Sequence, residues 1–425
     1  MPLKGEIIAI GDELVSGREL NTTSSFAAAR LFDAGHEIRY MTVIGDEPSD
    51  IKGALHLALQ RSSYIIVSGG LGPTSDDITN EAVAAALGLE LQEDGQVADT
   101  IRRMEHEYNT SFSEEFTRKL TMLPAGAMVL NPHGTAAGYE LVHDGVHLFF
   151  LPGVPEQLRE HLVERVIPRL NQLDPMRKKI RQKIFKLFGL TETQVNERLQ
   201  DLPDLDQGIR LGYYPVFPEV HLSITVKGED SPHVNQVFDA AVDRVESEFH
   251  NEIIATDSGS LEATVGNLLR KRGVMLAVAE SCTGGLVGKR LTDVPGSSSW
   301  FERGFITYSN SAKMELLGVS MDTLQQYGAV SSEAATEMVQ GAAMRSRAQS
   351  AIAITGIAGP GGGSAEKPVG TVFIALLVGD DLMVHRFLFH GSRDEIRAIT
   401  SETALDWLRR YLAYGSKLPG YRPES

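Results

Sequence analysis

The sequence has a single cysteine, no long apolar run and no excess of basic residues. Because Cys282 is the only cysteine among 425 residues, an intrachain disulfide framework is excluded and a reducing compartment such as the cytosol is expected. No apolar run approaches the ~18 residues that a membrane-spanning helix needs, and the N-terminus lacks the charged and apolar regions of a signal peptide. We therefore expect a cytoplasmic protein that does not enter a membrane.

Positive charge is also scarce. The formal net charge is -16 and the sequence pI is about 5.2, which argues against stable binding to nucleic acid or to an anionic membrane. One basic run, residues 177–186, either contacts nucleic acid or forms one solvated face of a strand, and the second interpretation is favoured. Phosphorylated substrates would therefore need a few local cationic side chains.

Length and patterning indicate an α/β protein with more than one domain. The 425 residues exceed a single domain, and 41 glycines fit many strand-to-helix turns. We predict a domain with a parallel or mixed sheet over residues 1–170, a small α+β domain over 171–256 and an α/β domain over 257–417. The polar, helix-breaking segment 256–260 is the predicted linker before the last domain.

The most informative motif is Glu280-Ser281-Cys282-Thr283-Gly284-Gly285, which lies between an apolar strand (274–279) and a helix-like run (286–291). A hydroxyl in this position lies where unpaired N–H groups at a helix start can stabilise an oxyanion. Ser281 is the predicted nucleophile, and Cys282 is the rival because such a turn could also ionise a thiol. The alternative is a tight turn whose hydroxyls only cap the helix.

Lys313 is the candidate base for that nucleophile. From residue 261 onward only His385 and His390 occur, in a strand-like stretch with no turn beside them. A lysine kept neutral by burial can replace histidine, and Tyr308 could relay the proton or orient the amine. Alternatively, Lys313 is a solvated helix residue.

The supporting strands suggest a single site. Apolar runs cover residues 274–279, 305–308, 351–354 and 372–378, and three of them enter polar or glycine-rich turns. They predict one rim of an α/β sheet, where such folds place their sites.

The N-terminal third has its own pattern of strands and glycine-rich turns. Apolar strands at 6–10, 64–67 and 147–151 each end in glycines, and an amphipathic helix covers 50–60. This alternation predicts a parallel sheet with phosphate-binding turns. Acidic residues at the same rim could hold a hard divalent cation: Asp12, Asp46, Asp76 and Asp77. Alternatively, the pair at 76–77 only caps a helix.

Residues 261–413 resemble the C-terminal domain of the CinA (competence/damage-inducible protein A) family, a nicotinamide-mononucleotide amidohydrolase. The resemblance is carried by residues 280–285, 308–313, 355–360, 368–372 and 391–393. It implies hydrolysis of nicotinamide mononucleotide to nicotinate mononucleotide and ammonia without a metal, in a homodimer. Ser281 would be the nucleophile, activated by Lys313 and Tyr308. The implied substrate-binding residues are Thr283, Gly284, Gly285, Thr355, Gly356 and Arg393, the last suited to a phosphate.

Residues 1–170 resemble the molybdopterin-binding-like domain that precedes it in CinA proteins, through residues 11–14, 69–79 and 152–155. The resemblance implies hydrolysis of ADP-ribose-type pyrophosphates with potassium and a divalent metal, for which Asp46, Asp76 and Asp77 are the candidate ligands. The implied ligand site comprises Asp12, Gly69, Gly70, Gly72, Thr74 and Asp77.

The sequence departs from that pattern at two places. Asn21-Thr22-Thr23 replaces the usual Asp-Thr-Asn, and residues 116–120 replace an Asn-x-Lys-Gln-Ala run. Binding of a nucleotide or pterin without hydrolysis is therefore the alternative for this domain. For the whole chain, a third alternative is a non-catalytic partner in DNA uptake or repair.

Overall fold

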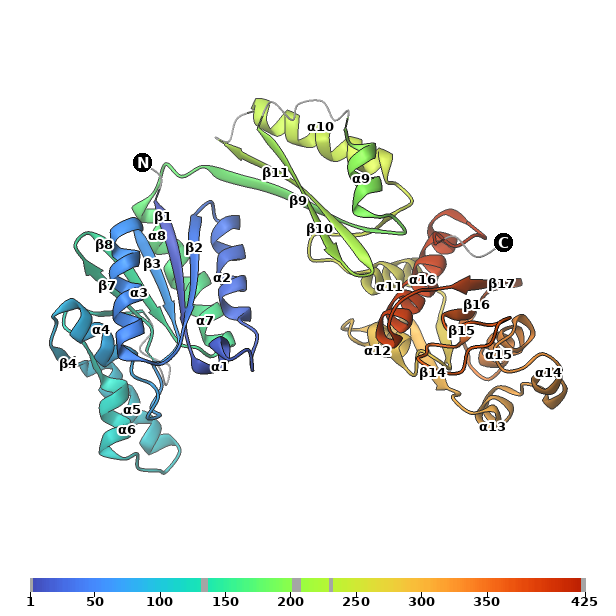
Figure 1. Ribbon diagram of the computed structural model, residues 1–425, viewed down its shortest axis with the longest axis horizontal. Coiled ribbons are helices and arrows are strands. Elements are labelled where there is room, and N and C mark those ends of the chain that lie inside the picture. The colour runs from blue at the N-terminus through green and yellow to red at the C-terminus, as the bar shows by residue number, and fades with distance from the viewer. Residues whose placement is uncertain (1–2, 131–136, 201–207, 229–231, 422–425) are drawn as a thin grey trace. The chain divides into compact units, whose positions relative to one another are not determined.

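The computed structural model describes residues 3–130, 137–200, 208–228 and 232–421. The chain divides into two compact units, one built mainly from residues up to 181 and the other from the remainder (Figure 1). The predicted α/β class is confirmed, because both units contain sheets covered by helices. The finer division at residues 170 and 256 stays a prediction.

The first unit is built on a six-stranded sheet with the order β2-β1-β3-β8-β7-β6. Its first four strands in that order are parallel, and β7 and β6 extend it in antiparallel fashion. The strands predicted at 6–10, 64–67 and 147–151 are β1, β3 and β8. The bounds are β1 Lys4–Ile10, β2 Glu37–Ile44, β3 Tyr64–Ser68, β6 Met128–Val129, β7 Tyr139–His143 and β8 Val146–Leu151; β4 Leu91–Glu93 and β5 Met122–Pro124 form a separate pair.

Helices cover both faces of this sheet. Helices α3 and α4 lie on one face and α2 and α7 on the other (Figure 1). Their apolar side chains pack against the strands in two separate clusters. Helix α7 begins at Pro155, where proline is favoured because its missing N–H would have no intrahelical acceptor at a first helical position. The bounds are α1 Asp12–Val15, α2 Thr22–Asp33, α3 Pro48–Arg61, α4 Thr79–Leu87, α5 Gly95–Glu107, α6 Glu114–Thr121, α7 Pro155–His161, a π-helical turn Leu162–Val166 and α8 Ile167–Leu173.

The second unit begins with a four-stranded sheet of order β10-β11-β9-β12, packed against two helices. Helix α9 starts with a capping box at Thr191. The basic run predicted as a strand lies largely in β9, where Lys183 pairs with Asp257 and Lys186 donates to the Gly259 carbonyl. The bounds are β9 Lys179–Phe188, α9 Glu192–Arg198, β10 Ile209–Val216, β11 Glu219–Gly228, α10 Pro232–Glu248 and β12 Ile253–Thr256.

The rest of the second unit is a five-stranded mixed sheet with the order β14-β13-β15-β16-β17. Strands β13, β14 and β15 are parallel, and β16 and β17 are antiparallel to their neighbours. The bounds are β13 Leu276–Glu280, β14 Phe301–Ile306, β15 Ser350–Gly356, β16 Thr371–Val378 and β17 Asp381–Leu388.

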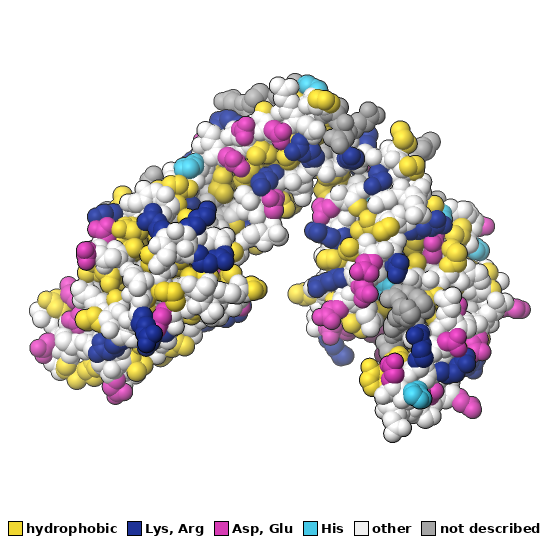
Figure 2. Space-filling view, turned by 180° about the vertical axis from the view of Figure 1, so that it is seen from behind, with side chains coloured by type: hydrophobic (Ala, Val, Ile, Leu, Met, Phe, Trp, Pro, Cys, Tyr) yellow, Lys and Arg dark blue, Asp and Glu magenta, His cyan; other side chains and the backbone are white. Residues whose placement is uncertain are grey.

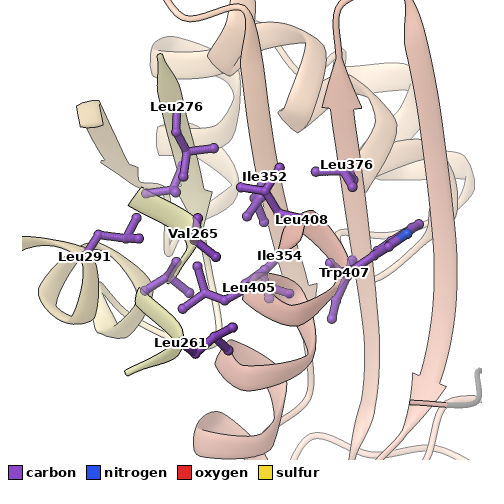
Figure 3. Packing of buried hydrophobic residues seen from close by; sticks show 14 of the residues in the cluster. Leu261, Val265, Leu276, Leu291, Ile352, Ile354, Leu376, Leu405, Trp407 and Leu408 are labelled. Atoms are coloured by element: carbon purple, nitrogen blue, oxygen red, sulfur yellow. The ribbon is translucent and has the colours of Figure 1, made fainter. Parts of the chain in front are cut away.

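Two helical layers enclose this sheet. Figure 3 shows Leu261 and Val265 of α11, Leu291 of α12 and Leu405 of α16 gathered against strand residues such as Ile352. Small alanines on the opposite sheet face pack with α15 and its neighbours. The helices are α11 Leu261–Arg272, α12 Leu286–Thr292, a 3₁₀ turn Ser297–Ser299, α13 Asn310–Ala312, the π-helical turn η4 Lys313–Leu317, α14 Met321–Gln326, α15 Ser332–Met344 and α16 Arg393–Tyr414.

The surface mixes charges of both signs. On the face shown in Figure 2, lysine and arginine side chains are interspersed with aspartate and glutamate. Among the described residues, no helix is both long and apolar enough to cross a bilayer.

Candidate active site

The parallel strands of the last sheet bring three turns to one edge. Ser281 follows β13, Thr307 follows β14 and Gly356 ends β15, and the carboxyl ends of parallel strands share an edge. The predicted rim is thus observed for three strands. The fourth, β16, runs in the opposite direction, so its first residue rather than its last lies at this edge.

Ser281 and Lys313 meet at this rim. The Lys313 Nζ lies 3.0 Å from the Ser281 Oγ, and it also donates to the carbonyl oxygens of Thr307 at 2.8 Å and Tyr308 at 3.5 Å. Only 1% of Lys313 is exposed, so the alternative of a solvated helix residue is wrong. Because η4 begins at Lys313 itself, the side chain can turn back toward the strand ends.

Burial determines the charge of this amine. Desolvation lowers the pKa of Lys313, and only a weaker interaction with the Cys282 thiol opposes that shift. A neutral amine has two N–H donors, which the carbonyls of Thr307 and Tyr308 can accept. Its lone pair is then left for the hydroxyl of Ser281, as a general base requires.

Cys282 lies beside this pair, but its thiol is not expected to ionise. Its side chain is buried, and burial raises the pKa of the thiol to about 12. A thiol with that pKa carries almost no thiolate near neutral pH, and the thiolate is the nucleophile. The electrostatics therefore favour Ser281 over Cys282.

The start of α12 is not the open anion site that the sequence suggested. The buried carboxylate of Glu280 accepts hydrogen bonds from the amides of Gly285 at 3.0 Å, Val287 at 3.1 Å and Gly288 at 2.8 Å. The Gly284 amide donates to the Ser281 carbonyl. The expectation that N–H groups at this helix start are unpaired is therefore wrong for these four residues.

Two amides of the turn remain for an oxyanion. Within the described part of the chain, the amides of Cys282 and Thr283 have no recorded oxygen acceptor; their recorded interaction is with the Cys282 thiol. They directly follow Ser281, which is where an attacked carbonyl oxygen would need donors. The candidate oxyanion hole therefore consists of the amides of Cys282 and Thr283 and does not include those of Gly284 and Gly285.

The implied substrate-binding residues differ in how accessible they are. Gly284 is exposed and Gly285 and Gly356 are half-buried, whereas the side chains of Thr283 and Thr355 are buried. The Thr355 hydroxyl donates to the Ala329 carbonyl at 2.7 Å. We infer that Thr355 shapes the turn, and direct contact of these residues with substrate stays a prediction.

Arg393 and Tyr308 contact each other at the rim. Arg393 donates to the Gly359 carbonyl at 2.6 Å and to the Tyr308 hydroxyl at 3.2 Å. The side chain of Tyr308 is 63% exposed, and its recorded contact with the Lys313 amine is made by the backbone carbonyl. Tyr308 can thus orient the amine, whereas a proton relay through its hydroxyl stays a prediction.

The first unit has a separate cavity of about 750 Å³ at the carboxyl ends of β1, β3 and β8. It is lined by glycine-rich turns, by apolar side chains such as Leu71 and Phe116, and by five carboxylates. The predicted ligand residues Gly69, Gly70, Gly72 and Asp77 line it. The Asp12 amide donates to Asp46, and Thr74 binds Asp77.

The acidic pair 76–77 organises a loop rather than a helix start. The Asp77 carboxylate accepts from the Thr74 amide at 2.8 Å, and both aspartates contact the Thr74 hydroxyl. Because α4 begins at Thr79 with no side-chain cap, the interpretation of Asp76-Asp77 as a helix cap is wrong. Lys119 donates to the carbonyls of Thr74 and Asp77 and so fixes this loop.

The divalent metal that the family resemblance implies does not fit the described carboxylates. Within residues 3–130 and the other described ranges, no three His, Cys, Asp or Glu side chains are grouped to hold one ion. Asp46, Asp76 and Asp77 all line the cavity, and burial, with the charges of Asp12, Glu13 and Asp76, raises the pKa of Asp46.

Three side chains at these sites have roles that the sequence did not predict. Glu280 and Arg397 hold the Ser281 turn, and Lys119 holds the 74–77 loop. One signal was available for Arg397: it lies four residues after Arg393, and residues at that spacing share a helix face.

The chain is similar to known proteins over nearly its full length. Family models match residues 6–172 (probable molybdopterin binding domain), 182–255 (damage-inducible protein CinA KH domain) and 258–412 (CinA C-terminal domain). A CinA-like protein of Desulfotalea psychrophila is 44% identical over 408 residues, which are 96% of this chain and 98% of that protein. A CinA-like protein of Geotalea uraniireducens is 39% identical over 411 residues, with the same coverage.

A solved structure resembles part of the chain. It is described as competence/damage inducible protein CihA from Agrobacterium tumefaciens, with 47% identity, 34% of this chain and 93% of that chain covered, and a TM-score of 0.33.

Proposed function

The chain belongs to the CinA family, and from this premise we propose that its C-terminal domain is an amidohydrolase that converts nicotinamide mononucleotide to nicotinate mononucleotide and ammonia. The single observation that carries the proposal is the buried contact of 3.0 Å between the Lys313 Nζ and the Ser281 Oγ. Within the described residues, a lysine with a lowered pKa against a strand-end serine is a nucleophile and base pair.

The reaction can be written with these two side chains. The Ser281 oxygen bonds to the carboxamide carbon while its proton moves to the Lys313 Nζ. Collapse of the tetrahedral intermediate breaks the carbon–nitrogen bond, and Lys313 returns the proton to the departing nitrogen, which leaves as ammonia. Water then attacks the acyl-enzyme and gives a proton to Lys313. Ser281 takes that proton back as nicotinate mononucleotide leaves.

Developing negative charge on the carbonyl oxygen would be stabilised by the amides of Cys282 and Thr283, which would exchange the Cys282 sulfur for the oxyanion. The phosphate of the substrate requires a cation, and Arg393 at the rim is suited to it because guanidinium groups bind phosphate oxygens in a fork. In the free protein its donors are directed at the Gly359 carbonyl and the Tyr308 hydroxyl. Both contacts would have to adjust when a phosphate binds.

The test is ammonia release from nicotinamide mononucleotide by the full chain. Ser281→Ala should abolish release, because the nucleophile is lost, with an unchanged thermal unfolding midpoint. Cys282→Ala is the matched control, since it alters the adjacent side chain, and should retain most of the activity. If Cys282→Ala is the inactive variant and Ser281→Ala is active, the nucleophile assignment fails.

A second, separate function is favoured by the cavity of about 750 Å³ in the first unit, a volume typical of small-molecule sites. We propose that it binds a nucleotide of the ADP-ribose class through the amides of its glycine-rich turns. Its described lining residues include no lysine or arginine, so binding should be stronger when a divalent cation accompanies the phosphates. Calorimetric titration of the full chain with ADP-ribose, with and without magnesium, tests this proposal.

A further inference from the structure

The turn that carries Ser281 is held from two sides by charged side chains. Glu280 accepts hydrogen bonds from the backbone amides that follow the turn, and Arg397 donates to the carbonyl of Thr283 inside it. The turn is also tied to β15, because the Ser281 amide donates to the Ile354 carbonyl at 3.0 Å.

Arg397 belongs to α16, one helical turn after Arg393. Its Nε and one terminal nitrogen lie 3.3 and 2.9 Å from the Thr283 oxygen, so the guanidinium binds that carbonyl with two donors. Its recorded carboxylate contact is Asp394 at 3.6 Å, with the Asp394 side chain 92% exposed. An exposed pair at that distance contributes little, so the Thr283 carbonyl is the main partner.

Glu280 holds the part of the chain that follows the turn. It is 1% exposed and makes three charge-assisted bonds to amides at the start of α12. Within the described residues it has no recorded lysine or arginine partner. The positive end of the helix and these three donors therefore stabilise its charge.

The two contacts act on neighbouring peptides of one turn. The Thr283 carbonyl also accepts the Leu286 amide at 3.2 Å, so the peptide between Thr283 and Gly284 is fixed by donors from two elements. Glu280 fixes the next peptides. Between these anchors lie the amides of Cys282 and Thr283, adjacent to the Ser281 hydroxyl. Within the described residues they contact the Cys282 sulfur and no oxygen acceptor.

We propose that Glu280 and Arg397 are positioning residues that clamp the Ser281 turn and hold the amides of Cys282 and Thr283 in place for the oxyanion. This inference rests on the proposed amidohydrolase function. Neither side chain needs to touch the substrate. The clamp sets geometry in advance, and a misplacement of about 1 Å can cost about 10²-fold in rate.

The experiment compares Arg397→Met and Glu280→Gln in the full chain. Each should lower kcat by about 10- to 100-fold with little change in KM, because the oxyanion forms only during the reaction. Arg397→Lys, which keeps the charge but not the fork, should recover part of the loss. The double variant should lose less than the product of the single losses, since both act on one turn.

The matched control is Arg177→Met. Arg177 also binds a backbone carbonyl, that of Ala34 at 2.9 Å, but in the first unit. It should leave kcat and KM unchanged. Thermal unfolding midpoints of all variants separate misfolding from a displaced turn.

A second measurement does not depend on activity. Amide hydrogen exchange across residues 282–288 should accelerate in both variants, while exchange in β15 stays slow. If the wild-type chain releases no ammonia, the amidohydrolase proposal fails, and the exchange data still test the clamp. Unchanged exchange, unchanged kcat or fully additive losses would overturn the clamp.

Discussion

At the residue scale, the contact between Ser281 and Lys313 could be predicted, because the sequence indicates where both residues lie relative to strands of one sheet. Ser281 follows a buried strand and Lys313 follows the next strand along the chain, so the common sheet edge predicts their proximity. The role of Glu280 could not be predicted, because a carboxylate at the end of an apolar strand usually means that the strand end is exposed to solvent. Its three amide donors come from a helix start whose direction only the fold sets.

Tyr308 shows why contacts of side chains in turns are hard to predict. The sequence suggested that Tyr308 relays a proton or orients the amine of Lys313. In the structure its backbone carbonyl contacts that amine, and its hydroxyl contacts Arg393, which is 85 residues away in the chain. A turn residue can present either its side chain or its backbone to a site, and spacing alone does not distinguish the two.

The charge state of Lys313 predicts how activity depends on pH. Burial lowers the pKa of this amine, so the lysine loses its proton at a lower pH than an exposed lysine does. The base must be neutral, and kcat for ammonia release should therefore fall as pH drops below that pKa and rise above it. The measurement is a profile of kcat against pH with nicotinamide mononucleotide.

Lys313→Arg is the informative variant for that profile. Arginine keeps the positive charge and the length but is not deprotonated in proteins. It should lower kcat by about 10²- to 10⁴-fold at every pH, the usual contribution of a general base. An active Lys313→Arg variant with a wild-type pH profile would mean that another group removes the serine proton.

At the element scale, buried strands were predicted closely and exposed ones were not. Strands β3, β8 and β15 match the predicted runs to within three residues because both of their faces are largely buried, which makes the sequence continuously apolar. Strand β14 covers Phe301–Ile306 rather than 305–308. It lies at the sheet edge, and its first half contains the polar pair 302–303 and Gly304, so the apolar pattern shows only its last two residues.

The packing of three helices predicts a pH-dependent stability. Arg290 of α12 binds both Glu262 of α11 and Glu402 of α16, and one cation cannot fully compensate two buried carboxylates. Burial raises the pKa of Glu402 to about 7, with a further contribution from Glu219, whereas Arg290 holds the pKa of Glu262 below its usual value. One Glu402 oxygen is buried without a partner among the described residues, which adds to the cost of a charged carboxylate there.

The direction of the effect follows from proton linkage. A raised pKa means that the folded state binds the proton more tightly, so this stabilisation is complete below the unfolded pKa and is lost as pH rises through about 7. Its upper limit is about 3 kcal/mol. Glu402→Gln should therefore gain stability relative to wild type between about pH 5 and about pH 8.

Urea denaturation at several pH values measures that difference in the free energy of unfolding. The control is Glu262→Gln. The pKa of Glu262 is lowered in the folded state, so its stabilisation is present at neutral pH and is lost only as pH falls into the acid range. This variant should therefore differ from wild type by a nearly constant amount between about pH 5 and about pH 8. Parallel pH dependences for Glu402→Gln and wild type would contradict a protonated Glu402.

At the scale of the whole molecule, the same architecture occurs twice with different contents. Both α/β sheets gather glycine-rich turns at the carboxyl ends of parallel strands, which is why sequence analysis located both sites. What differs is charge: the first unit combines a cavity with five carboxylates, and the second has a buried lysine against a serine. The cavity itself could not be predicted, because its walls combine glycine-rich turns with residues of α1, α2 and α6 that are spread between residues 10 and 157.

The last prediction concerns the independence of these two sites in the full chain. Asp77→Ala removes the carboxylate that binds the Thr74 amide in the loop beside the cavity. Loss of such a charge-assisted bond costs about 1.5–3 kcal/mol, so the affinity for ADP-ribose should fall by about 10- to 100-fold. Release of ammonia from nicotinamide mononucleotide should not change, because the Ser281 and Lys313 contact lies in the other unit.

Ser281→Ala should show the opposite pattern in the same calorimetric and ammonia assays. If Ser281→Ala weakens ADP-ribose binding, or Asp77→Ala stops ammonia release, then one ligand site serves both measurements and the assignment of two separate sites is wrong.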